Sequence, residues 1–209
     1  MKTILIVLAC LLPFGDYAQD NNHVPSKELR GSGRVVRETR PLKPFDGIEI
    51  DHFPARIVVE AGTAESSVTI SIDDNLRSLL QVDDRNGTLT LAFKDPNNRP
   101  FWVSKSNIDV VIRTPTLQRF KHGSNSEVAV RGLRGESFAF VNEGNGNVQL
   151  QGQVRTLDLV STANGDIDAE GLLTTTVNVL TQANATIRVN AQDVNEMRTA
   201  NAEVINIAD

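Results

Sequence analysis

Hydrophobic and polar residues alternate along most of the chain from Phe45 onward, with the period of two that is typical of β-strands. The dipeptide Asn86-Gly87 predicts a tight hairpin turn, because both residues tolerate a positive φ angle. Residues 74–81 are compatible with one helical turn that carries its leucines on one side. The sequence contains no long amphipathic helix, and the pattern therefore predicts an all-β fold. The clearest alternating segments are residues 48–51, 57–59, 68–72 and 89–93.

An asparagine returns every 19 or 20 residues in the second half of the chain, and a β-branched residue follows each copy by three positions. A fixed period of this length indicates stacked supersecondary units, in which each strand pairs in parallel with its copy in the next unit. The sequence predicts N-terminal strands that merge into a short parallel β-helix, or β-solenoid, with rungs of about 20 residues. The asparagines are Asn125, Asn145, Asn164 and Asn184, and the β-branched residues are Val128, Val148, Ile167 and Ile187.

The repeat pattern can be traced back to Ile108, which lies 20 residues before Val128. Phe120 likewise lies 20 residues before Phe140. At the other end, Asn201 follows Asn184 by only 17 residues, which predicts an atypical terminal rung.

The repeated asparagine has a structural explanation. Asparagine tolerates left-handed backbone conformations and hydrogen-bonds its own turn, so it suits a sharp corner. Stacked copies can also pass amide hydrogen bonds from one rung to the next. We therefore interpret Asn125, Asn145, Asn164 and Asn184 as a structural ladder, with ligand binding by these residues as the alternative.

The N-terminal residues are expected to direct export. Lys2 precedes an apolar run that is too short to span a membrane, which is typical of a secretory signal peptide over residues 1–18. The segment around Cys10 resembles a lipoprotein box, but the apolar run continues past that cysteine and favours a leader without lipidation. Residues 19–33 are polar and aperiodic, and predict a flexible tail. Residues 34–209 are then expected to form a single domain.

Composition narrows the possible partners. The chain of 209 residues has a formal net charge of -5, which argues against nucleic acid or anionic lipid as a partner. Loss of residues 1–18 would remove the only cysteine, so the exported chain is expected to have no disulfide. No second apolar stretch approaches 20 residues, and we expect no membrane span in the mature chain.

Several segments resemble the putative auto-transporter adhesin, head GIN domain family. The resemblance is carried by residues 40–50 (RPLKPFDGIEI), 56–62 (RIVVEAG), 86–91 (NGTLTL) and 111–117 (VIRTPTL), in this order and spacing. It implies a right-handed β-helix-like fold in an exported envelope protein of a Gram-negative bacterium, in the periplasm or on the outer surface. The family offers no established catalytic residues that match positions in this sequence.

The sequence gives little support for enzymatic or metal chemistry. Its three histidines, at positions 23, 52 and 122, show no ligand spacing, and we expect neither a metal site nor a cofactor. Glu49 and Asp51 share one face of a predicted strand at roughly 7 Å, a separation that suits glycosidase carboxylates. A solvent-facing strand produces the same spacing, and we favour that interpretation.

The segment 94–107 is the best candidate for a recognition site. It contains the only tryptophan of the chain, Trp102, beside Phe101 and near Arg99 and Lys105. Aromatic rings beside polar groups suit stacking on a sugar or anchoring of a protein partner. The alternative is that the two aromatic residues cover the open end or the seam of the solenoid.

These observations predict an exported, non-enzymatic envelope protein that serves as an adhesion, interaction or structural module. Its partner would be a glycan or an envelope or host protein. A periplasmic scaffold or stress component is the first alternative, and a glycan-directed enzyme on a β-helix is the second. The sequence leaves the oligomeric state open.

Overall fold

The computed structural model describes residues 26–209 except residues 96, 98, 200 and 209, and it confirms the all-β prediction. The predicted signal peptide lies outside the described residues. Within them, no helix is long and apolar enough to cross a membrane. The elements are β1 (Lys27–Arg30), β2 (Val35–Pro41), β3 (Gly47–Asp51), β4 (Arg56–Ala61), β5 (Ser67–Asp73), the 3-10 helix η1 (Asp74–Leu79), β6 (Leu80–Arg85), β7 (Thr88–Phe93), β8 (Phe101–Ser104), β9 (Ile108–Thr114), β10 (Arg119–Gly123), β11 (Glu127–Asn142), β12 (Val148–Ser161), β13 (Ile167–Thr181), β14 (Thr186–Arg198) and β15 (Glu203–Asn206).

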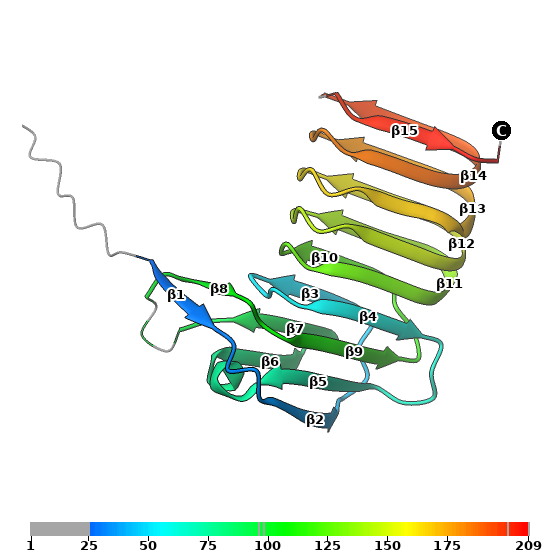
Figure 1. The fold of residues 1–209 in the computed structure, drawn as a ribbon. Coiled ribbons are helices and arrows are strands. Elements are labelled where there is room, and N and C mark those ends of the chain that lie inside the picture. Colours follow the sequence, from blue (N-terminus) through cyan, green and yellow to red (C-terminus); the bar gives the residue numbers. More distant parts are fainter. Residues whose placement is uncertain (1–25, 96, 98, 200, 209) are drawn as a thin grey trace, which may run out of the picture.

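Strands β11 to β15 lie one above the other and pair in parallel, each with its neighbour in the sequence (Figure 1). The predicted register is confirmed, because the β-branched residues that recur every 19 or 20 positions pair with one another. The atypical last strand continues the same column through Val204. The column that results is Val128, Val148, Ile167, Ile187 and Val204.

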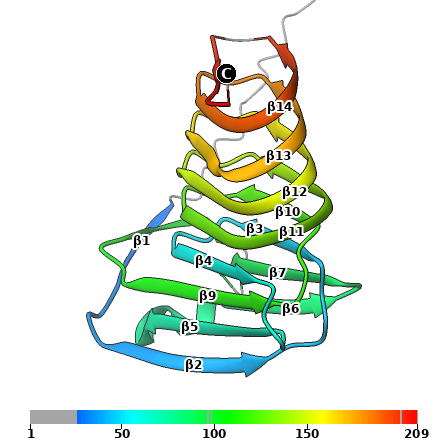
Figure 2. The same cartoon turned by 90° about the vertical axis from the view of Figure 1, so that its right-hand side faces the viewer.

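The lower part of the fold is a mixed sheet. Strands β3 and β4 form the level beneath the stack, where β3 pairs with β10 and β4 with the first half of β11, all in parallel. Beneath them lie β7 and β9, and the antiparallel pairs β6–β7, β5–β9 and β2–β5 complete the base. The sheet has 13 strands among the described residues, and it is strongly curled (Figure 2).

The stack begins later in the sequence than the repeat predicts. Ile108 and Val110 do not lie directly beneath β11, because β4 is inserted between β9 and β11 and pairs Ile57 with both Val110 and Val128. The first level of the repeat therefore starts at Arg119, in β10. Strand β4 has the same alternation as the repeated strands, and the period alone could not reveal that an N-terminal strand fills this level.

The local predictions in the base are confirmed. The Asn86-Gly87 turn joins β6 to β7, with φ angles of 54° and 71° at its two residues. The predicted helical turn is η1, which buries Leu76 and Leu79.

Inward-facing residues of the parallel strands form one continuous core. Three phenylalanines of β10 and β11, Phe120, Phe138 and Phe140, are almost completely buried. Phe140 packs edge-on against Phe120 at a centroid distance of 5.7 Å and stacks with Phe138 at 6.4 Å. These contacts link two successive levels, because Phe120 and Phe140 are partners in the parallel register.

A column of polar side chains runs beside this core. His122, Asn142, Ser161 and Thr181 occupy equivalent positions on β10 to β13 and are fully buried. His122 Nδ1 and Asn142 Oδ1 form a hydrogen bond of 2.9 Å. Among the described residues, His122 Nε2 and Asn142 Nδ2 have no hydrogen-bond partner. Burial lowers the pKa of His122, although the bond to Asn142 acts in the opposite direction.

Stability is expected to fall in acid because of His122. Its pKa in the folded state lies below the ordinary value of about 6.5, so the unfolded chain binds more protons. The contribution of neutral, buried His122 to the free energy of unfolding is fully present above about pH 6.5 and is lost as the pH decreases below that value. Urea unfolding at several pH values between about 7.5 and 5 measures this slope. His122→Leu should flatten this slope, and an unchanged slope in His122→Leu would exclude His122 as its source.

Glycines are required where the corners of successive levels touch. A Cβ atom at Gly146 would lie 1.7 Å from the carbonyl oxygen of Ser126 in the level below. A Cβ atom at Gly144 would lie equally close to the Ser124 oxygen. No rearrangement of side chains relieves a clash with backbone, so only a shift of the two levels could admit a larger residue.

Gly146→Ala is therefore expected to lower the free energy of unfolding by about 1–3 kcal/mol. Gly171→Ala is the matched control, because its Cβ would approach the flexible Gln151 side chain at 3.0 Å and would meet backbone only at an ordinary contact distance, 3.6 Å from the Leu150 oxygen. Chemical denaturation of both variants checks the prediction. Equal losses at the two positions would show that the close approach of the corners is not the cause.

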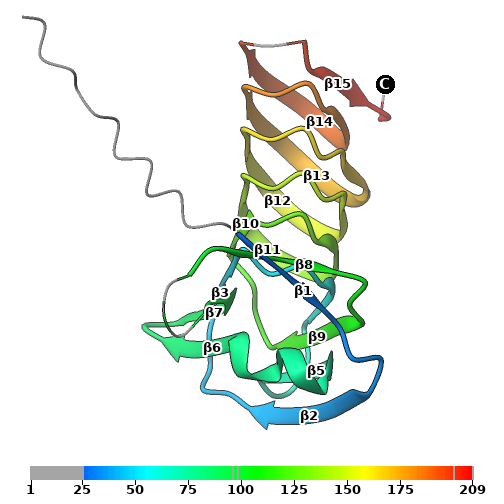
Figure 3. The same ribbon diagram turned by 60° about the vertical axis from the view of Figure 1, so that its left-hand side comes forward.

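The prediction of a flexible tail over residues 19–33 is wrong for its second part. Strand β1 pairs in parallel with β8, from Lys27–Phe101 to Arg30–Ser104 (Figure 3). The polar composition that suggested a tail reflects a strand that adds to the outside of the fold and buries little apolar surface. Glu28 accepts a hydrogen bond from Ser104 Oγ at 2.6 Å, and the bonds from Ser104 and Arg30 lower the pKa of its carboxyl.

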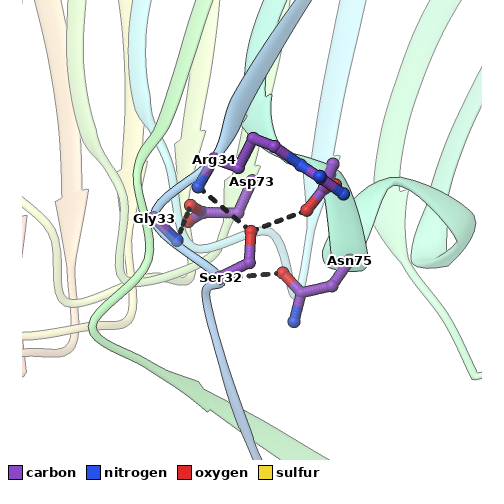
Figure 4. Close-up of polar contacts among 6 residues, drawn as sticks. Ser32, Gly33, Arg34, Asp73 and Asn75 are labelled. Atoms are coloured by element: carbon purple, nitrogen blue, oxygen red, sulfur yellow. Dashed lines mark hydrogen bonds and ion pairs between the residues drawn. The ribbon is translucent and has the colours of Figure 1, made fainter.

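The link from β1 to β2 is held by polar contacts with the start of η1 (Figure 4). The backbone N–H of Gly33 donates to Asp73 Oδ1 at 2.8 Å, and that of Ser32 donates to Asn75 Oδ1 at 2.9 Å. Ser32 Oγ also donates to Asp74 at 2.6 Å, and the pKa of Asp74 is lowered by this bond and by Arg34. Residues 30–34 are thus fastened to the base.

Candidate functional site

The asparagine repeat forms hydrogen bonds between successive corners. The backbone N–H of Asn145 donates to Asn125 Oδ1 at 3.2 Å, and Asn164 and Asn184 each donate to the asparagine below at 3.1 Å. The side-chain amide of Asn145 adds a bond of 3.3 Å to the same oxygen of Asn125. Each side-chain carbonyl thereby satisfies a backbone N–H that points along the stack at a corner, where no strand partner exists.

The geometry of the corner differs from the expected one in one respect. None of the four asparagines has a positive φ angle, so the left-handed conformation that we expected is absent from these positions. The corners turn through small neighbours instead: Ser124 and Ser126, Gly144 and Gly146, Ala163 and Gly165, and Ala183 and Ala185 flank the four asparagines. Asparagine is needed for its acceptor oxygen rather than for its backbone freedom.

The ladder ends at Asn125. Beneath residues 124–126 lies the turn between β3 and β4, residues 52–55, which contains no asparagine. Two buried serines replace the ladder at this step, because Ser124 Oγ and Ser126 Oγ both donate to the carbonyl of Phe53. Asn125 itself is exposed on the outer side.

A groove of about 1000 Å³ lies at the foot of the ladder. It is bounded by the turn after β3, by the ends of β7 and β8, and by the lowest two corners of the stack. Its lining includes Asp51, His52, Pro54, Phe93, Lys94, Asp95, Arg99, Pro100, Phe101, Trp102, Asn125 and Glu143. The fold thus brings the predicted recognition segment against the end of the asparagine ladder.

Aromatic residues form the apolar part of the groove. Phe93 is buried and packs edge-on against Phe53 at 4.9 Å. Phe101 is partly buried against the core, and alternation along β8 places its neighbour Trp102 on the other side. Trp102 keeps 52 % of its surface exposed. Phe101 thus packs partly against the core while Trp102 is half exposed, and both residues line the groove.

Acidic residues form the polar part. His52 is held in a left-handed backbone conformation, with φ 47°, and its Nδ1 lies 2.5 Å from Asp51 Oδ1. Glu143 accepts a hydrogen bond from Lys121 Nζ at 3.1 Å, and this bond raises the pKa of Lys121. A positive φ angle is uncommon outside glycine, although histidine adopts it more often than most residues, and such positions cluster at functional sites.

The groove gathers three of the four residues that the sequence singled out. Arg99 lines it beside Phe101 and Trp102, and its Nε lies 3.6 Å from Asp95. The pKa of Asp95 is lowered, first by the backbone N–H of Asn97 and also by Arg99. Lys105 does not line the groove; it follows β8 in a left-handed conformation with φ 48°.

Sequence reasoning missed the remaining residues of the groove, above all Asp51, Asn125 and Glu143, which line it together with Trp102. Asp51 was considered only as a partner of Glu49, which does not line the groove. No local pattern could have found this set, because its members come from strands and corners that are far apart in the sequence. A left-handed histidine after a β-strand has no sequence signature either.

Residues 44–202 match the family model described as putative auto-transporter adhesin, head GIN domain. The chain belongs to this family. The match contains β3 to β14 and the whole lining of the groove, whereas β1 and β2 precede it and β15 follows it. Comparison with curated proteins gives no match.

Solved structures share the fold of this head GIN domain. A putative adhesin from Bacteroides fragilis NCTC 9343 aligns with a TM-score of 0.64 and 18 % identity, over 86 % of this chain and 100 % of that chain. A putative adhesin from Parabacteroides merdae ATCC 43184 aligns with a TM-score of 0.51 and 14 % identity, over 87 % of this chain and 100 % of that chain. At these identities the likeness concerns the fold.

Groups that could bind a metal ion do not gather in the described part of this domain, where no three His, Cys, Asp or Glu side chains come together.

Glu49 faces Lys121 at 4.0 Å on the outer surface of β3. Each acid of the groove thus has its own basic neighbour: Asp51 has His52, Asp95 has Arg99 and Glu143 has Lys121.

Proposed function

We propose that this head GIN domain is an exported adhesion or interaction module of the bacterial envelope, and that it recognises its partner at the groove beside Trp102. The observation that carries the proposal is the exposed tryptophan in a concave site that also contains convergent polar side chains. Binding sites combine apolar and aromatic walls with a few placed polar groups, and tryptophan is prominent among residues that dominate binding energy.

In this proposal the stack is a short right-handed β-solenoid that serves as a rigid support. Its parallel register and the asparagine bonds between corners favour a stiff column, and the handedness follows the resemblance of the sequence to the head GIN family. A rigid support suits recognition, because groups held in place lose less conformational entropy on binding.

The same proposal assigns no catalytic step to the groove. A glycosidase needs one carboxylic acid that stays protonated near neutral pH, which burial in an apolar pocket provides. The side chains of Asp51 and Glu143 are 56 % and 46 % exposed, and each has a basic neighbour. Exposed carboxyl groups beside basic side chains suit hydrogen bonding to a ligand better than the buried acid of an acid–base pair.

Membership of an adhesin-named family supports export, and the predicted leader over residues 1–18 agrees with it. Digestion of intact cells by an external protease tests whether the protein is on the outer surface, with lysed cells as the positive control. Adhesion requires digestion on intact cells. Protection on intact cells with digestion after lysis would contradict adhesion and favour the periplasmic scaffold.

A further inference from the structure

We propose that the ligand of the groove is a glycan with neutral pyranose units, one of which stacks on Trp102. This inference rests on the proposed function, because it names the chemical class that the same groove recognises. A pyranose ring presents an apolar face of C–H groups and a rim of hydroxyls. The groove offers a matching pair of surfaces, one aromatic and one rich in hydrogen-bonding groups.

The position of Trp102, which provides the aromatic surface, is fixed by the strand that carries it. Trp102 lies in β8, which is fixed on one side by pairing with β1 and on the other face by the packing of Phe101 and Val103 against the core. Its ring therefore remains exposed without being free to collapse onto the core. Exposure of a large aromatic side chain on a fixed strand costs solvation free energy, which stacking against a sugar face would recover.

The polar surface matches hydroxyl groups. The side-chain oxygens of Asp51 and Glu143 offer several lone pairs, and each side chain uses only part of this capacity on its basic neighbour. Asn125 accepts two bonds from Asn145 through Oδ1, so the group that it can offer a ligand is its Nδ2 donor. Acceptors and a donor side by side suit the hydroxyls of a sugar, each of which both donates and accepts.

The charge of the groove selects against acidic ligands. Three carboxylates and two permanently basic residues line it: Asp51, Asp95 and Glu143 against Lys94 and Arg99. Arg99 is already engaged by Asp95, and Lys121, the partner of Glu143, lies outside the lining, so the lining itself has one more acid than permanent base. A uronic acid or sulfated sugar would be repelled there, whereas a neutral sugar would not.

Intrinsic fluorescence tests the inference directly, because Trp102 is the only tryptophan of the chain. The probes are cellotetraose, chitotetraose and mannotetraose, with tetragalacturonate as the acidic comparison, titrated into the purified exported chain. We expect a saturable change of Trp102 emission with at least one neutral probe and none with tetragalacturonate. Reducing-end release over the same period should stay at background, because the inference concerns binding.

Variants identify the contacts by calorimetry. Trp102→Ala should weaken binding of the responding probe by about tenfold or more, and Asp51→Asn together with Glu143→Gln should weaken it by a similar factor. Met197→Ala removes another exposed apolar side chain, far from the groove in sequence, and should bind as the parent does. Circular dichroism confirms that each variant is folded.

Four outcomes would overturn the inference: no response to any neutral probe, equal binding by Trp102→Ala, preference for tetragalacturonate, or hydrolysis of the probe. The first three leave the proposed function standing if Trp102→Ala still abolishes attachment of cells, because the partner is then of another class, such as a protein. Sugar binding that depends on Trp102, without any effect of Trp102→Ala on attachment, would instead contradict the proposed function alone.

Discussion

Phe140→Ala is expected to lower the free energy of unfolding by about 3–5 kcal/mol. The side chain is fully buried and contacts phenylalanines of its own level and of the level below. Its removal leaves a cavity at the junction where the stack meets β10, which backbone ladders on both sides prevent from closing. For a domain of this size, the loss corresponds to a fall of roughly 10 °C in Tm.

Val141→Ala is the matched control for this cavity. Val141 is the next residue of β11 and lies on the outer, partly exposed side of the strand. Thermal and chemical unfolding of both variants should show a small loss for Val141→Ala and a large one for Phe140→Ala. Similar losses at the two positions would show that the phenylalanine cluster does not hold the first levels of the stack together.

Asp73→Ala is expected to have the second-largest effect, a loss of about 3–5 kcal/mol. The carboxylate is fully buried and joins two segments that are distant in the sequence. It accepts hydrogen bonds from the backbone N–H groups of Gly33 at 2.8 Å and of Asn107 at 2.7 Å. Alanine would leave both donors without their charged acceptor, and bonds to charged groups contribute about 1.5–3 kcal/mol each.

Asp74→Ala tests whether burial is the reason. Asp74 also binds the 32–34 segment, through Ser32 and Arg34, but this contact is exposed and screened by solvent, so its loss should destabilise the fold far less. Hydrogen exchange adds a specific readout, because Asp73→Ala should release protection in β1 and β2 before the stack opens. A loss in Asp73→Ala no greater than that in Asp74→Ala would contradict the assigned role.

The parallel stack could be predicted because each level repeats the same residues at the same spacing. Val128 and Val148 must face the same core if the asparagine corners stack, and the observed register places them together. The level formed by β3 and β4 could not be placed, because its sequence separation from β10 and β11 exceeds 60 residues and follows no period. Alternation indicates that a strand exists but not which strand it joins.

Strand β1 was missed for a different reason. Its residues, Lys27–Arg30, are almost all polar, so no hydrophobic pattern marks them as a strand. Pairing with β8 provides the backbone hydrogen bonds, and the Asp73 contacts fix the segment that follows. Such a strand depends on tertiary partners that the sequence does not reveal.

The candidate site was half predictable. Trp102 and Phe101 stood out because aromatic residues are few in this chain and these two lie between proline-marked polar runs. The residues around them depend on which corners of the stack lie near β8, and this is set by the tertiary structure. Asn125 was expected to be a structural residue, with ligand binding as the alternative, and the fold places it at the exposed end of the ladder in the groove.

The central claim is that the protein recognises its partner at the groove beside Trp102, and attachment of cells that carry Trp102→Ala tests it most directly. Cells with the parent protein, with Trp102→Ala, with Met197→Ala and without the protein would be settled on mucin-coated and on bare surfaces. If the groove is the recognition site, Trp102→Ala cells should attach as poorly as cells without the protein. Met197→Ala cells should attach as well as cells with the parent protein. Full attachment by Trp102→Ala cells, with the protein present at its normal level, would contradict the claim.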